Sequence, residues 1–597
     1  MAIIVQKFGG TSVADAKKIL SAAHKAIGAQ QAGHQVVVVV SAMGKNTDML
    51  VDLAGQITDR PLAREMDMLL STGEQVSVAL MAMAIHSLGH KAVSLTGAQI
   101  GIKTDSSHTK ARIQSISTER LGQLLDEGHI VIAAGFQGID ENFNITTLGR
   151  GGSDLTAVAL AAVLRAEACE IYTDVDGVYT TDPRKIPEAR RMAQISYDEM
   201  LELASLGAGV MHSRSVEFGK KFGVPIHVRS SFVDAPGTMV VAEPEASGQP
   251  VGGAALTEDE ARVTVSDVPD QPGTSYAILS RIAAKNISVD MIVQNVGAEG
   301  KADISFTVLR NDLPLATEAV TEALGDLGAG TLDYDDQVSK VSAVGLGMAR
   351  QTGVAHQMFR ALSDAGVNVQ MITTSEIKIS VLVERRGAVD ALRAVHQTFG
   401  LGTPPATPGP PVAASKGAAV PDALAPDALA VVTRLAGMED LVIEGVVLDD
   451  TQARLTIADV PDRPGIAAAV FEKIAAGGLF VDMIVQSSGH QGRTILSFTV
   501  PAQDLETALG LTGEIAAEFG CGAVTSSPHV AKLSVSGVGM RSHTGVAMRM
   551  FKSLAELGIN VEMINTSEVR VNVVVDGRHG QQGLACLQQA FADVLLS

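Results

Sequence analysis

The feature that most constrains the fold of this 597-residue chain is a long internal repeat in its second half. The segment Arg262 to Asn295 returns as Arg454 to Ser487, and Lys340 to Val383 returns as Lys532 to Val575. Both pairs lie about 192 residues apart, so a block of roughly 135 residues occurs twice. Each block again contains two similar halves, with the order strand, turn, helix, strand, strand. We therefore expect four small α+β modules, arranged as two pairs.

A stretch rich in proline and alanine, residues 399–435, separates the first module pair, residues 255–398, from the second, residues 436–597. Its composition supplies too little apolar material for a core, which predicts an extended linker. An ordered surface loop on the second block is the alternative.

The first part of the chain, residues 1–240, shows alternating apolar strand segments and helical segments. Unbroken β-branched runs such as Val36 to Val40 are typical of strands that are buried on both faces. The alternation predicts an α/β fold, an αβα sandwich with a mainly parallel sheet. In such sheets, ligands bind at the carboxyl ends of the strands, so the loops that follow them are the place to look for a site.

A glycine turn follows the first apolar strand, Ile3 to Phe8, in the sequence KFGGTSVADAKKIL. Strand, glycine turn and helix start together form a cradle of backbone N–H groups that suits an anion, and Lys7 stands at its lip. The spacing is not that of a P-loop, which needs four residues between its glycines and a Gly-Lys-Ser/Thr end. On its own, such a turn predicts phosphate binding only weakly.

The segment Leu148 to Ala157, LGRGGSDLTA, repeats this arrangement of strand, glycines and helix start. Its glycines allow a ligand to approach the backbone, and the first helical turn offers N–H groups to an anion. Arg150 adds a forked cation that suits a carboxylate, and Asp154 adds a charge that can hold an ammonium group. An amino acid carries both groups. The alternative is that Ser153 or Asp154 only caps a helix.

Charge and cysteine content narrow the class of partner and compartment. The formal net charge of −20 argues against nucleic acid and anionic membranes, because neither is attracted to such a surface. Three widely spaced cysteines, Cys169, Cys521 and Cys586, predict a reducing compartment without a disulfide framework. The N-terminus lacks the pattern of a secretory signal, and no apolar run approaches the roughly 20 residues of a membrane span. We expect a soluble, cytoplasmic protein.

Five motifs in the first part occur in an order that resembles the aspartate kinases of the amino acid kinase superfamily. They are KFGGTS, SAMGKNTDML, STGE, GRGGSD and YTDVDGVYTTDPR, which begin at Lys7, Ser41, Ser71, Gly149 and Tyr172. The stretch LASLGAGVMHSRSVEF, residues 203–218, is similar to the same family. The four downstream modules resemble ACT domains, which are small βαββαβ units that sense amino acids. No GxGxxG motif follows a strand in the last region, so the resemblance is to monofunctional members.

The resemblance implies roles for residues in each motif. The ATP phosphates are cradled by Lys7, Phe8, Gly9 and Gly10, and the nucleotide is held by Ser41, Thr173, Asp174, Tyr179, Arg184 and Lys185. The amino-acid substrate is surrounded by Thr47, Glu74, Arg150, Gly151, Gly152, Ser153 and Asp154. The expected catalytic residues are Lys7, Arg150 and Asp154. The chain departs from some members at Phe232, where they have a second lysine near the phosphates.

Glu74 lies in an otherwise apolar helical stretch, Ala63 to Ala84. A buried carboxylate is costly unless it is paired. A position on the solvated face of the helix is the alternative to the substrate-binding role.

The resemblance implies ATP-dependent phosphorylation of the side-chain carboxylate of L-aspartate, the first step of lysine, threonine and methionine biosynthesis. This carboxylate has an ordinary pKa near 3.9, so it is ionised at neutral pH and needs no general base. Asp154 is then expected to orient Lys7 or the substrate ammonium group. Transfer depends on positioning and on charge neutralisation by Lys7, by helix N-termini and by Mg²⁺, which ATP is expected to carry without protein ligands.

In the repeats, VPDQPG and VPDRPG place an acidic loop at a helix start, where Asp270 and Asp462 can meet an effector ammonium group. Family resemblance implies that lysine, threonine or both inhibit through these modules. One expected pocket comprises Gly273, Ser275, Gln294, Asn368 and Val369. Its expected duplicate comprises Gly465, Ala467, Gln486, Asn560 and Val561. Purely structural turns are the alternative.

Two other functions stay open at this point. A superfamily kinase that acts on glutamate or a nucleotide would share the KFGG-type cradle, but it would lack SAMGKNTDML and STGE together with ACT modules. A catalytically dead amino-acid sensor would keep the modules but would have lost Lys7, Arg150 or Asp154, and all three are present. ACT sheets usually pair edge to edge, so a homodimer or a higher homo-oligomer is expected.

Overall fold

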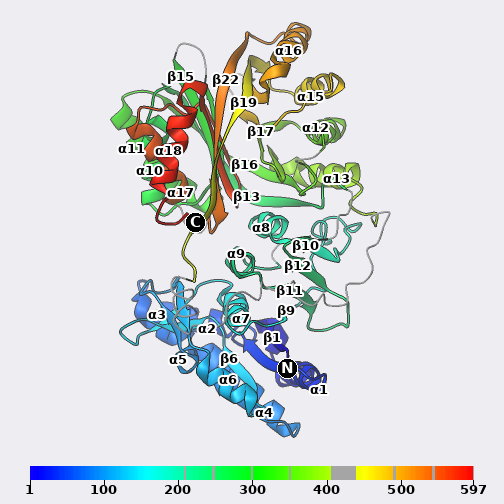
Figure 1. The fold of residues 1–597 in the computed structure, drawn as a ribbon, viewed down its shortest axis with the longest axis vertical. Helices are drawn as coiled ribbons and strands as arrows, with labels where there is room; N and C mark the ends of the chain where they lie inside the picture. The colour runs from blue at the N-terminus through cyan, green and yellow to red at the C-terminus, as the bar shows by residue number, and fades with distance from the viewer. Residues whose placement is uncertain are drawn as a thin grey trace.

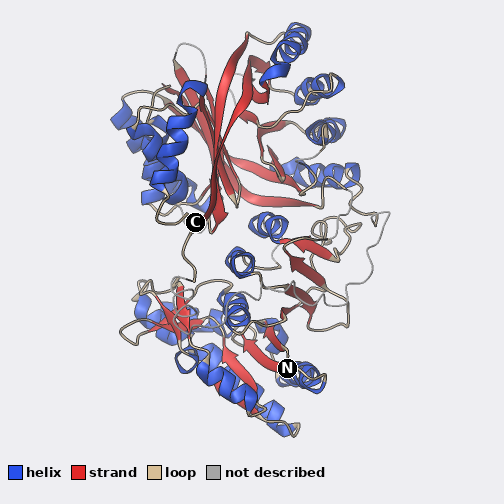
Figure 2. Cartoon of the chain, in the orientation of Figure 1, coloured by secondary structure: helices blue, strands red, loops and turns tan. Residues whose placement is uncertain are grey.

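The computed structural model describes residues 1–597 except 207–209, 245–248, 297–299, 349–350, 405–437, 488–491, 541–544 and 596–597. Most of the expected linker, residues 399–435, therefore lies outside the described residues. The described chain forms an eight-stranded, a four-stranded and a twelve-stranded sheet, with helices packed around them (Figures 1 and 2).

The N-terminal part folds around the eight-stranded sheet, whose order is β10-β12-β11-β9-β1-β2-β6-β3. All neighbouring strands are parallel except β11 and β12, which confirms the prediction of a mainly parallel sheet. The strands are β1 (Ile3–Phe8), β2 (Gln35–Val40), β3 (Ala92–Leu95), β6 (Ile130–Ala134), β9 (Ala168–Thr173), β10 (Gln194–Ser196), β11 (Ile226–Ser230) and β12 (Thr238–Val241).

Helices cover both faces of this sheet, as the valines of β2 illustrate. Val36, Val38 and Val40 belong to one hydrophobic core, and Val37 and Val39 belong to another. Because successive side chains of a strand point to opposite faces, an unbroken valine run fits a strand between two helical layers. One layer contains α1 (Ala16–Gln31) and α4 (Thr72–Ser87), and the other contains α7 (Gly152–Val163), α8 (Tyr197–Ser205) and α9 (Ser213–Phe222).

The four-stranded sheet, with the order β5-β4-β7-β8, belongs to the same part of the chain. Its last strand ends one residue before the LGRGGSD segment, so it fixes where that segment begins. The strands are β4 (Ile102–Thr104), β5 (Ile113–Ile116), β7 (Gln137–Ile139) and β8 (Ile145–Thr147). The remaining helices of this part are α2 (Asn46–Gly55), α3 (Ala63–Leu70), α5 (Gly97–Ile100) and α6 (Glu119–Asp126).

One helical stretch among the described residues, Ala63–Ser87, has the length and apolar composition of a membrane span. Half of its most apolar window is buried inside the protein. The stretch comprises α3 and α4, and Val78, Met81 and Ile85 of α4 pack in the core beneath the eight-stranded sheet. A core helix meets the same criteria, so the stretch is weak evidence for a membrane.

The repeated part forms the twelve-stranded sheet, to which each repeat contributes six consecutive strands. The first repeat has the order β14-β15-β13-β16-β18-β17, and the second has the order β20-β21-β19-β22-β24-β23. The repeats join where β17 pairs antiparallel with β20, with Ile372 opposite Gln486. The first six strands are β13 (Gly253–Pro269), β14 (Val289–Val296), β15 (Lys301–Leu309), β16 (Thr331–Val344), β17 (Val369–Thr374) and β18 (Lys378–Glu384). The others are β19 (Val442–Pro461), β20 (Ile484–Ser487), β21 (Arg493–Pro501), β22 (Val524–Val538), β23 (Met563–Thr566) and β24 (Arg570–Asp576).

Helices flank this sheet in two groups that Figure 1 shows on opposite sides. The left group contains α10 (Thr274–Ala284), α11 (Leu313–Leu327), α17 (Gly545–Glu556) and α18 (Gly580–Ala590), which share one hydrophobic core. The right group contains α12 (Val354–Asp364), α13 (Ala388–Thr398), α15 (Ile466–Ala476) and α16 (Leu505–Phe519), which share another. Each group mixes helices of both repeats, so the modules pair across the repeats.

The modules are interleaved in the chain, whereas the sequence predicts two successive halves in each repeat. The first residues of β13, Gly253 to Thr257, pair with the end of β16, and its later residues, Arg262 to Ser266, pair with the start of β16. One long strand thus serves two modules, and the first module is inserted into the second. The strand β19 behaves in the same way against β22.

Candidate active site

The glycine turn after β1 packs against the loop that follows β2. The Gly44 N–H donates to the Gly10 carbonyl at 3.0 Å, and a Cβ on Gly10 would lie 2.7 Å from the Ala42 carbonyl oxygen. A side chain at Gly10 would therefore force the two loops apart. Both loops follow the carboxyl ends of neighbouring parallel strands, which is where an αβα fold binds its ligands.

Lys7, the residue before the end of β1, forms an ion pair with Asp154, with 2.5 Å between Nζ and Oδ1. The two side chains are only 11% and 12% exposed. Reduced access to water strengthens the attraction between the two charges. Of the two roles predicted for Asp154, the described geometry favours the one in which it orients Lys7.

The helix α7 begins without a capping side chain. Its N-cap residue is Gly151, which has a φ of 75°, and a Cβ there would lie 2.3 Å from the Cβ of His212. Glycine adopts this left-handed conformation without strain, so both the turn and the contact require it. Ser153 and Asp154 lie inside the first helical turn, and the interpretation of either as the helix cap is wrong.

The predicted substrate residues differ in exposure. Gly152, Ser153 and Asp154 are buried, whereas Arg150 is exposed one residue before the left-handed turn. Thr47 is half-buried in the first turn of α2. The Arg150 guanidinium, which could pair with a substrate carboxylate, therefore lies at the surface, whereas the Asp154 carboxylate is buried.

Glu74 is 4% exposed, so its predicted alternative position on a solvated face is wrong. Its Oε1 accepts a hydrogen bond from the Ala42 N–H at 3.0 Å. Burial raises the pKa of Glu74 to about 7, and the hydrogen bond from Ala42 acts in the opposite direction. Among the described residues, Oε2 has no hydrogen-bond partner. A buried carboxylate oxygen without a partner is suited to a substrate ammonium group.

The residues predicted to hold the nucleotide follow β9 and β2. The ring of Phe8 stacks on that of Tyr172, with 4.7 Å between the centroids, so the ends of β1 and β9 are fixed side by side. The Thr173 hydroxyl donates to Asp174 at 3.2 Å, and both groups follow this stack. The Ser41 N–H donates to the Phe8 carbonyl at 3.1 Å, which places Ser41 beside the same strand end.

The remaining predicted nucleotide residues are engaged with other side chains. The Tyr179 hydroxyl donates to an aspartate three residues earlier at 2.9 Å. Arg184 pairs with Asp182 at 2.9 Å and is largely exposed. Lys185 pairs with Glu258 of β13 at 2.6 Å, so it also connects this loop to the twelve-stranded sheet.

Phe232 stands at the position where the family resemblance would place a second lysine near the phosphates. Its side chain is half exposed beside the glycine turn. The Ser231 hydroxyl donates to the Ser12 hydroxyl at 2.5 Å, which ties the two loops together. The Nζ of Lys18, from α1, lies 5.3 Å from the centroid of the Phe232 ring. A cation from another element is therefore present at this position.

Sequence analysis missed an anchor behind the GRGGSD segment. Arg214 donates to the carbonyls of Leu148 and Ala111, and its guanidinium pairs with Glu439 at 2.7 Å. Glu439 also accepts a hydrogen bond from the Ile113 N–H at 2.6 Å. Because this glutamate comes shortly after the Pro/Ala-rich stretch, no local pattern predicts its contact with the N-terminal part.

A second missed residue, Asp67 of α3, supports the same region. Its carboxylate is fully buried and accepts hydrogen bonds from the Thr147 hydroxyl at 2.5 Å and from the Thr109 N–H at 3.0 Å. The His108 ring lies 2.7 Å from its other oxygen. The helix α3 also carries Arg64 and Glu65, so its sequence does not single out Asp67 as the buried carboxylate.

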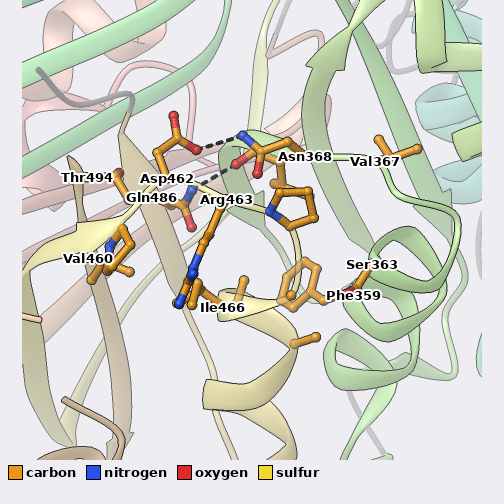
Figure 3. Close-up of a pocket in the computed structure, with 16 residues that line it drawn as sticks. Phe359, Ser363, Val367, Asn368, Val460, Asp462, Arg463, Ile466, Gln486 and Thr494 are labelled. Atoms are coloured by element: carbon orange, nitrogen blue, oxygen red, sulfur yellow. Dashed lines mark hydrogen bonds between the residues drawn. The ribbon is translucent and has the colours of Figure 1, made fainter. Parts of the chain in front are cut away.

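The loop with Asp462 faces the second module of the first repeat (Figure 3). The Asn368 amide donates to Asp462 at 2.8 Å, and the Gln486 amide donates to the Val369 carbonyl at 3.0 Å. Gly465 and Ala467 line the same pocket. Its volume is about 20 Å³, which is room for one water molecule.

The loop with Asp270 faces the last module of the second repeat. The Asn560 amide donates to Asp270 at 2.7 Å, and the Gln294 amide donates to the Val561 carbonyl at 2.6 Å. The Ser275 hydroxyl donates to Gln294 at 2.5 Å.

The predicted assignment of facing residues was therefore wrong. Asn368 and Val369 belong with Asp462, and Asn560 and Val561 belong with Asp270. The physical reason is that the modules pair across the repeats. The strand β17 pairs antiparallel with β20, and α10 and β14 pack against α17 and β23.

Comparisons with known proteins agree with this architecture. The Amino acid kinase family matches residues 2–230, and the ACT domain family matches residues 341–399 and 533–591. Aspartate kinase of Pseudomonas putida is 51% identical over 406 residues, which are 68% of this chain and 99% of the relative. The chain belongs to the aspartate kinase family.

Solved structures of aspartate kinases match as well. The crystal structure of aspartate kinase from Synechocystis covers 99% of this chain and 98% of its own, with 41% identity and a TM-score of 0.52. Two structures of E. coli aspartokinase III, one with aspartate and ADP and one with lysine and aspartate, are 25% identical over 66% of this chain. They cover 99% of their own chain, with TM-scores of 0.56 and 0.51. The prediction of an aspartate kinase with regulatory ACT domains is confirmed, and the family binds nucleotide.

Proposed function

We propose that this aspartate kinase transfers the γ-phosphoryl group of ATP to the side-chain carboxylate of L-aspartate and forms 4-phospho-L-aspartate. The observation that carries the proposal is the ion pair between Lys7 and Asp154. It holds a cation between a glycine turn suited to phosphate and a helix start suited to an amino acid. The reaction is the first step of lysine, threonine and methionine biosynthesis.

In this proposal, Glu74 receives the ammonium group of aspartate, because its Oε2 has no partner among the described residues. Arg150 pairs with a substrate carboxylate through its forked guanidinium. The glycines of the left-handed turn and the hydroxyls of Thr47 and Ser153 complete the substrate site. The side-chain carboxylate of aspartate is ionised at neutral pH, so it attacks without a general base.

The nucleotide is proposed to lie over the glycine turn, with its phosphates at Gly9 and Gly10. The residues that hold it are Lys7, Phe8, Ser41, Thr173, Asp174, Tyr179, Arg184 and Lys185. Lys7 neutralises charge on the transferred group, and Asp154 keeps its ammonium group at that point. The described residues contain no group of three or more His, Cys, Asp or Glu side chains that could hold a metal ion. Mg²⁺ enters with ATP in this proposal and adds charge neutralisation at the phosphates.

Lysine, threonine or both are proposed to inhibit by binding at the Asp462 and Asp270 loops. The structure of E. coli aspartokinase III with lysine supports an amino-acid effector for the family. An effector ammonium group at Asp462 would replace the Asn368 amide and open a pocket that now has room for one water molecule. Binding would therefore change the contact between two modules.

The test is an aspartyl-hydroxamate assay with ATP, L-aspartate and Mg²⁺, with and without lysine and threonine. We expect ATP-dependent hydroxamate with aspartate and none with glutamate, and inhibition by at least one of the two effectors. Product formation from glutamate alone would overturn the proposed substrate. Activity unchanged by millimolar lysine and threonine would overturn the proposed regulation.

We further propose a catalytic domain at residues 1–240, ACT pairs at 255–398 and 436–597, and a linker at 399–435. Sheets of ACT domains commonly pair edge to edge, so we propose a homodimer or a higher homo-oligomer. The cytoplasm is the proposed location, since the cysteine content fits a reducing compartment. Size-exclusion chromatography with light scattering tests the assembly.

A further inference from the structure

The nucleotide loop, residues 174–193, joins β9 to β10 and packs against the repeated part of the chain. It carries four of the residues proposed to hold the nucleotide, Asp174, Tyr179, Arg184 and Lys185. Ile186, in the middle of the loop, is 1% exposed and belongs to the hydrophobic core that α13 shares with α12, α15 and α16. In Figure 1, α13 is the helix of the right group that lies nearest to the N-terminal part. The position of the loop therefore depends on α13.

Thr180 ties the nucleotide loop together. It is fully buried, and its N–H donates to the Arg190 carbonyl at 2.8 Å. Its hydroxyl accepts from the Arg190 N–H at 3.0 Å, and its carbonyl accepts from the Ala254 N–H of β13 at 2.7 Å. Because Thr180 directly follows Tyr179 in the chain, these hydrogen bonds also fix the backbone at that tyrosine.

A histidine of the repeated part completes the surroundings of Thr180. His396, on α13, is 1% exposed, and its Nε2 lies 3.1 Å from the Thr180 hydroxyl oxygen. Burial lowers the pKa of His396, so the ring is neutral at neutral pH and its Nε2 can accept a hydrogen bond from the hydroxyl. A Cβ on Gly402 would lie 3.5 Å from the ring Cε1 and 3.0 Å from the Glu188 carbonyl oxygen, so the ring is closely packed. The imidazole thus joins α13 directly to the nucleotide loop.

The duplicated position in the second repeat shows that the module itself does not need this histidine. The residue equivalent to His396 is Gln588 of α18, and it is exposed. The preceding core position is kept, since Val395 and Leu587 are both fully buried. A residue required for the fold of each module would be buried in both copies. The burial of His396 therefore follows from its contact with the nucleotide loop.

The nucleotide loop has a second polar contact with the repeated part, the ion pair between Lys185 and Glu258. The Glu258 side chain is 53% exposed, so water screens this pair and it restrains the loop weakly. The contact between His396 and Thr180 is shielded from water, where the loss of one partner leaves the other polar group unpaired. The position of the loop is therefore expected to depend more on His396 than on Glu258.

We propose that His396 is a positioning residue for the nucleotide and acts through Thr180. By holding Thr180, the imidazole keeps Tyr179 and the residues after it in the arrangement that binds ATP. The inference rests on the proposed nucleotide site, because His396 reaches ATP only through this loop. Aspartate binding and phosphoryl transfer depend little on His396, since Glu74 and Lys7 belong to other elements, α4 and β1.

Isothermal titration of the full-length protein with ADP and Mg²⁺ tests this role without phosphoryl transfer. His396→Leu keeps a side chain that packs in the space of the ring but removes the hydrogen bond, so it is expected to weaken ADP binding about tenfold. His396→Gln introduces the residue of the second repeat, whose amide can reach Thr180, and it is expected to stay within about twofold of the wild type. Gln588→Ala is the matched control at the exposed equivalent position, and its ADP binding is expected to be unchanged.

Steady-state kinetics with the hydroxamate assay separate positioning from a general loss of structure. In His396→Leu, the KM for ATP is expected to rise about tenfold, while kcat and the KM for aspartate change by less than about twofold. Thr180→Val removes the other partner, so it tests the same contact even if His396→Leu folds poorly. The double variant is expected to bind ADP as weakly as Thr180→Val alone, because both changes remove one interaction.

The inference is overturned if His396→Leu and Thr180→Val bind ADP as tightly as the wild type. It is also overturned if His396→Gln binds ADP no better than His396→Leu, or if kcat and both KM values worsen equally in His396→Leu. A wild-type protein that binds ADP but forms no hydroxamate would overturn the proposed reaction instead, and the ADP titrations would still decide the role of His396.

Discussion

Lys378 and Glu202 form an ion pair at 2.8 Å in which the two side chains are only 3% and 0% exposed. Glu202 belongs to α8 of the catalytic part, and Lys378 begins β18 of the first repeat. The second carboxylate oxygen of Glu202 accepts a hydrogen bond from the Glu568 N–H, which belongs to the second repeat, at 3.0 Å. A single catalytic-side carboxylate therefore contacts both repeats.

The variant Glu202→Gln is expected to lower stability by about 3–5 kcal/mol, because it removes the carboxylate that is in direct contact with the buried Lys378. Burial lowers the pKa of Lys378 and the charge of Glu202 raises it, with a net increase in the intact protein. Urea denaturation measures the loss. The double variant Glu202→Met/Lys378→Met removes both charges and is expected to recover most of the stability. A single variant as stable as the wild type would contradict a structural role for the pair.

Lys7→Ala is expected to lower kcat by about 10²–10³-fold, with a much smaller change in the KM for ATP. The reason is that Lys7 neutralises charge that develops during transfer, while the glycine turn retains the phosphates. Steady-state kinetics with the hydroxamate assay provide the measurement. Lys17→Ala, an exposed lysine on the following helix, is the control and is expected to behave as the wild type. Equal losses in kcat and in apparent ATP affinity would count against this role.

The raised pKa of Glu74, about 7, predicts a pH dependence of substrate binding. Aspartate binding requires the ionised carboxylate, so the KM for aspartate is expected to rise as the pH falls below about 7. The effect of pH on folding stability has the opposite sign. The buried site favours the neutral form of Glu74, so this contribution to stability is present below the ordinary pKa of 4.5. It is lost as the pH rises through about 7. Glu74→Gln is expected to raise the KM and to flatten its pH profile. A wild-type KM that is constant between pH 6 and 8 would contradict the assignment.

Much of the catalytic part was predictable from local patterns. Short sequence segments suffice to predict the valine run of β2 and the glycine turns after β1 and β8. The mainly parallel sheet and its loops could therefore be predicted from the sequence. The pairing of Lys7 with Asp154 was proposed as one of two roles, because both residues lie at strand or helix ends that an αβα fold brings together.

The arrangement of the modules was not predictable in the same way. Asn368 faces Asp462 only because the edges of β17 and β20 pair, and an edge pairing between repeats leaves no local signature. The two loops, VPDQPG and VPDRPG, are nearly identical, so their sequences fit a contact with Asn368 as well as one with Asn560. The contact of Glu439 with Arg214 depends on the path of the chain after the Pro/Ala-rich stretch, which composition does not specify.

Asp462→Ala and Asp270→Ala form a matched pair that tests the two effector loops. Each removes the carboxylate proposed to hold an effector ammonium group, so each is expected to weaken inhibition by at least one effector by about tenfold or more. The measurement is the effector concentration that halves activity. Asn368→Ala is expected to change inhibition by the same effector as Asp462→Ala, but in the opposite direction, because it removes the amide that the effector ammonium group would replace at Asp462. A change in inhibition that follows the effector of the Asp270 loop would contradict the observed pairing of Asn368 with Asp462.

Glu439→Gln is expected to raise the KM for aspartate several-fold while kcat changes little, because Arg214 would lose the charge that holds it against the Leu148 carbonyl, next to the GRGGSD turn. Stability is expected to fall by about 1–3 kcal/mol, since the two side chains are largely buried. Glu444→Gln is the matched control. It removes the more exposed pair with Lys220 between the same two parts of the chain, so its cost is expected to stay below about 1 kcal/mol. If both variants behaved alike in kinetics and in urea denaturation, the anchor would have no specific effect on the substrate turn.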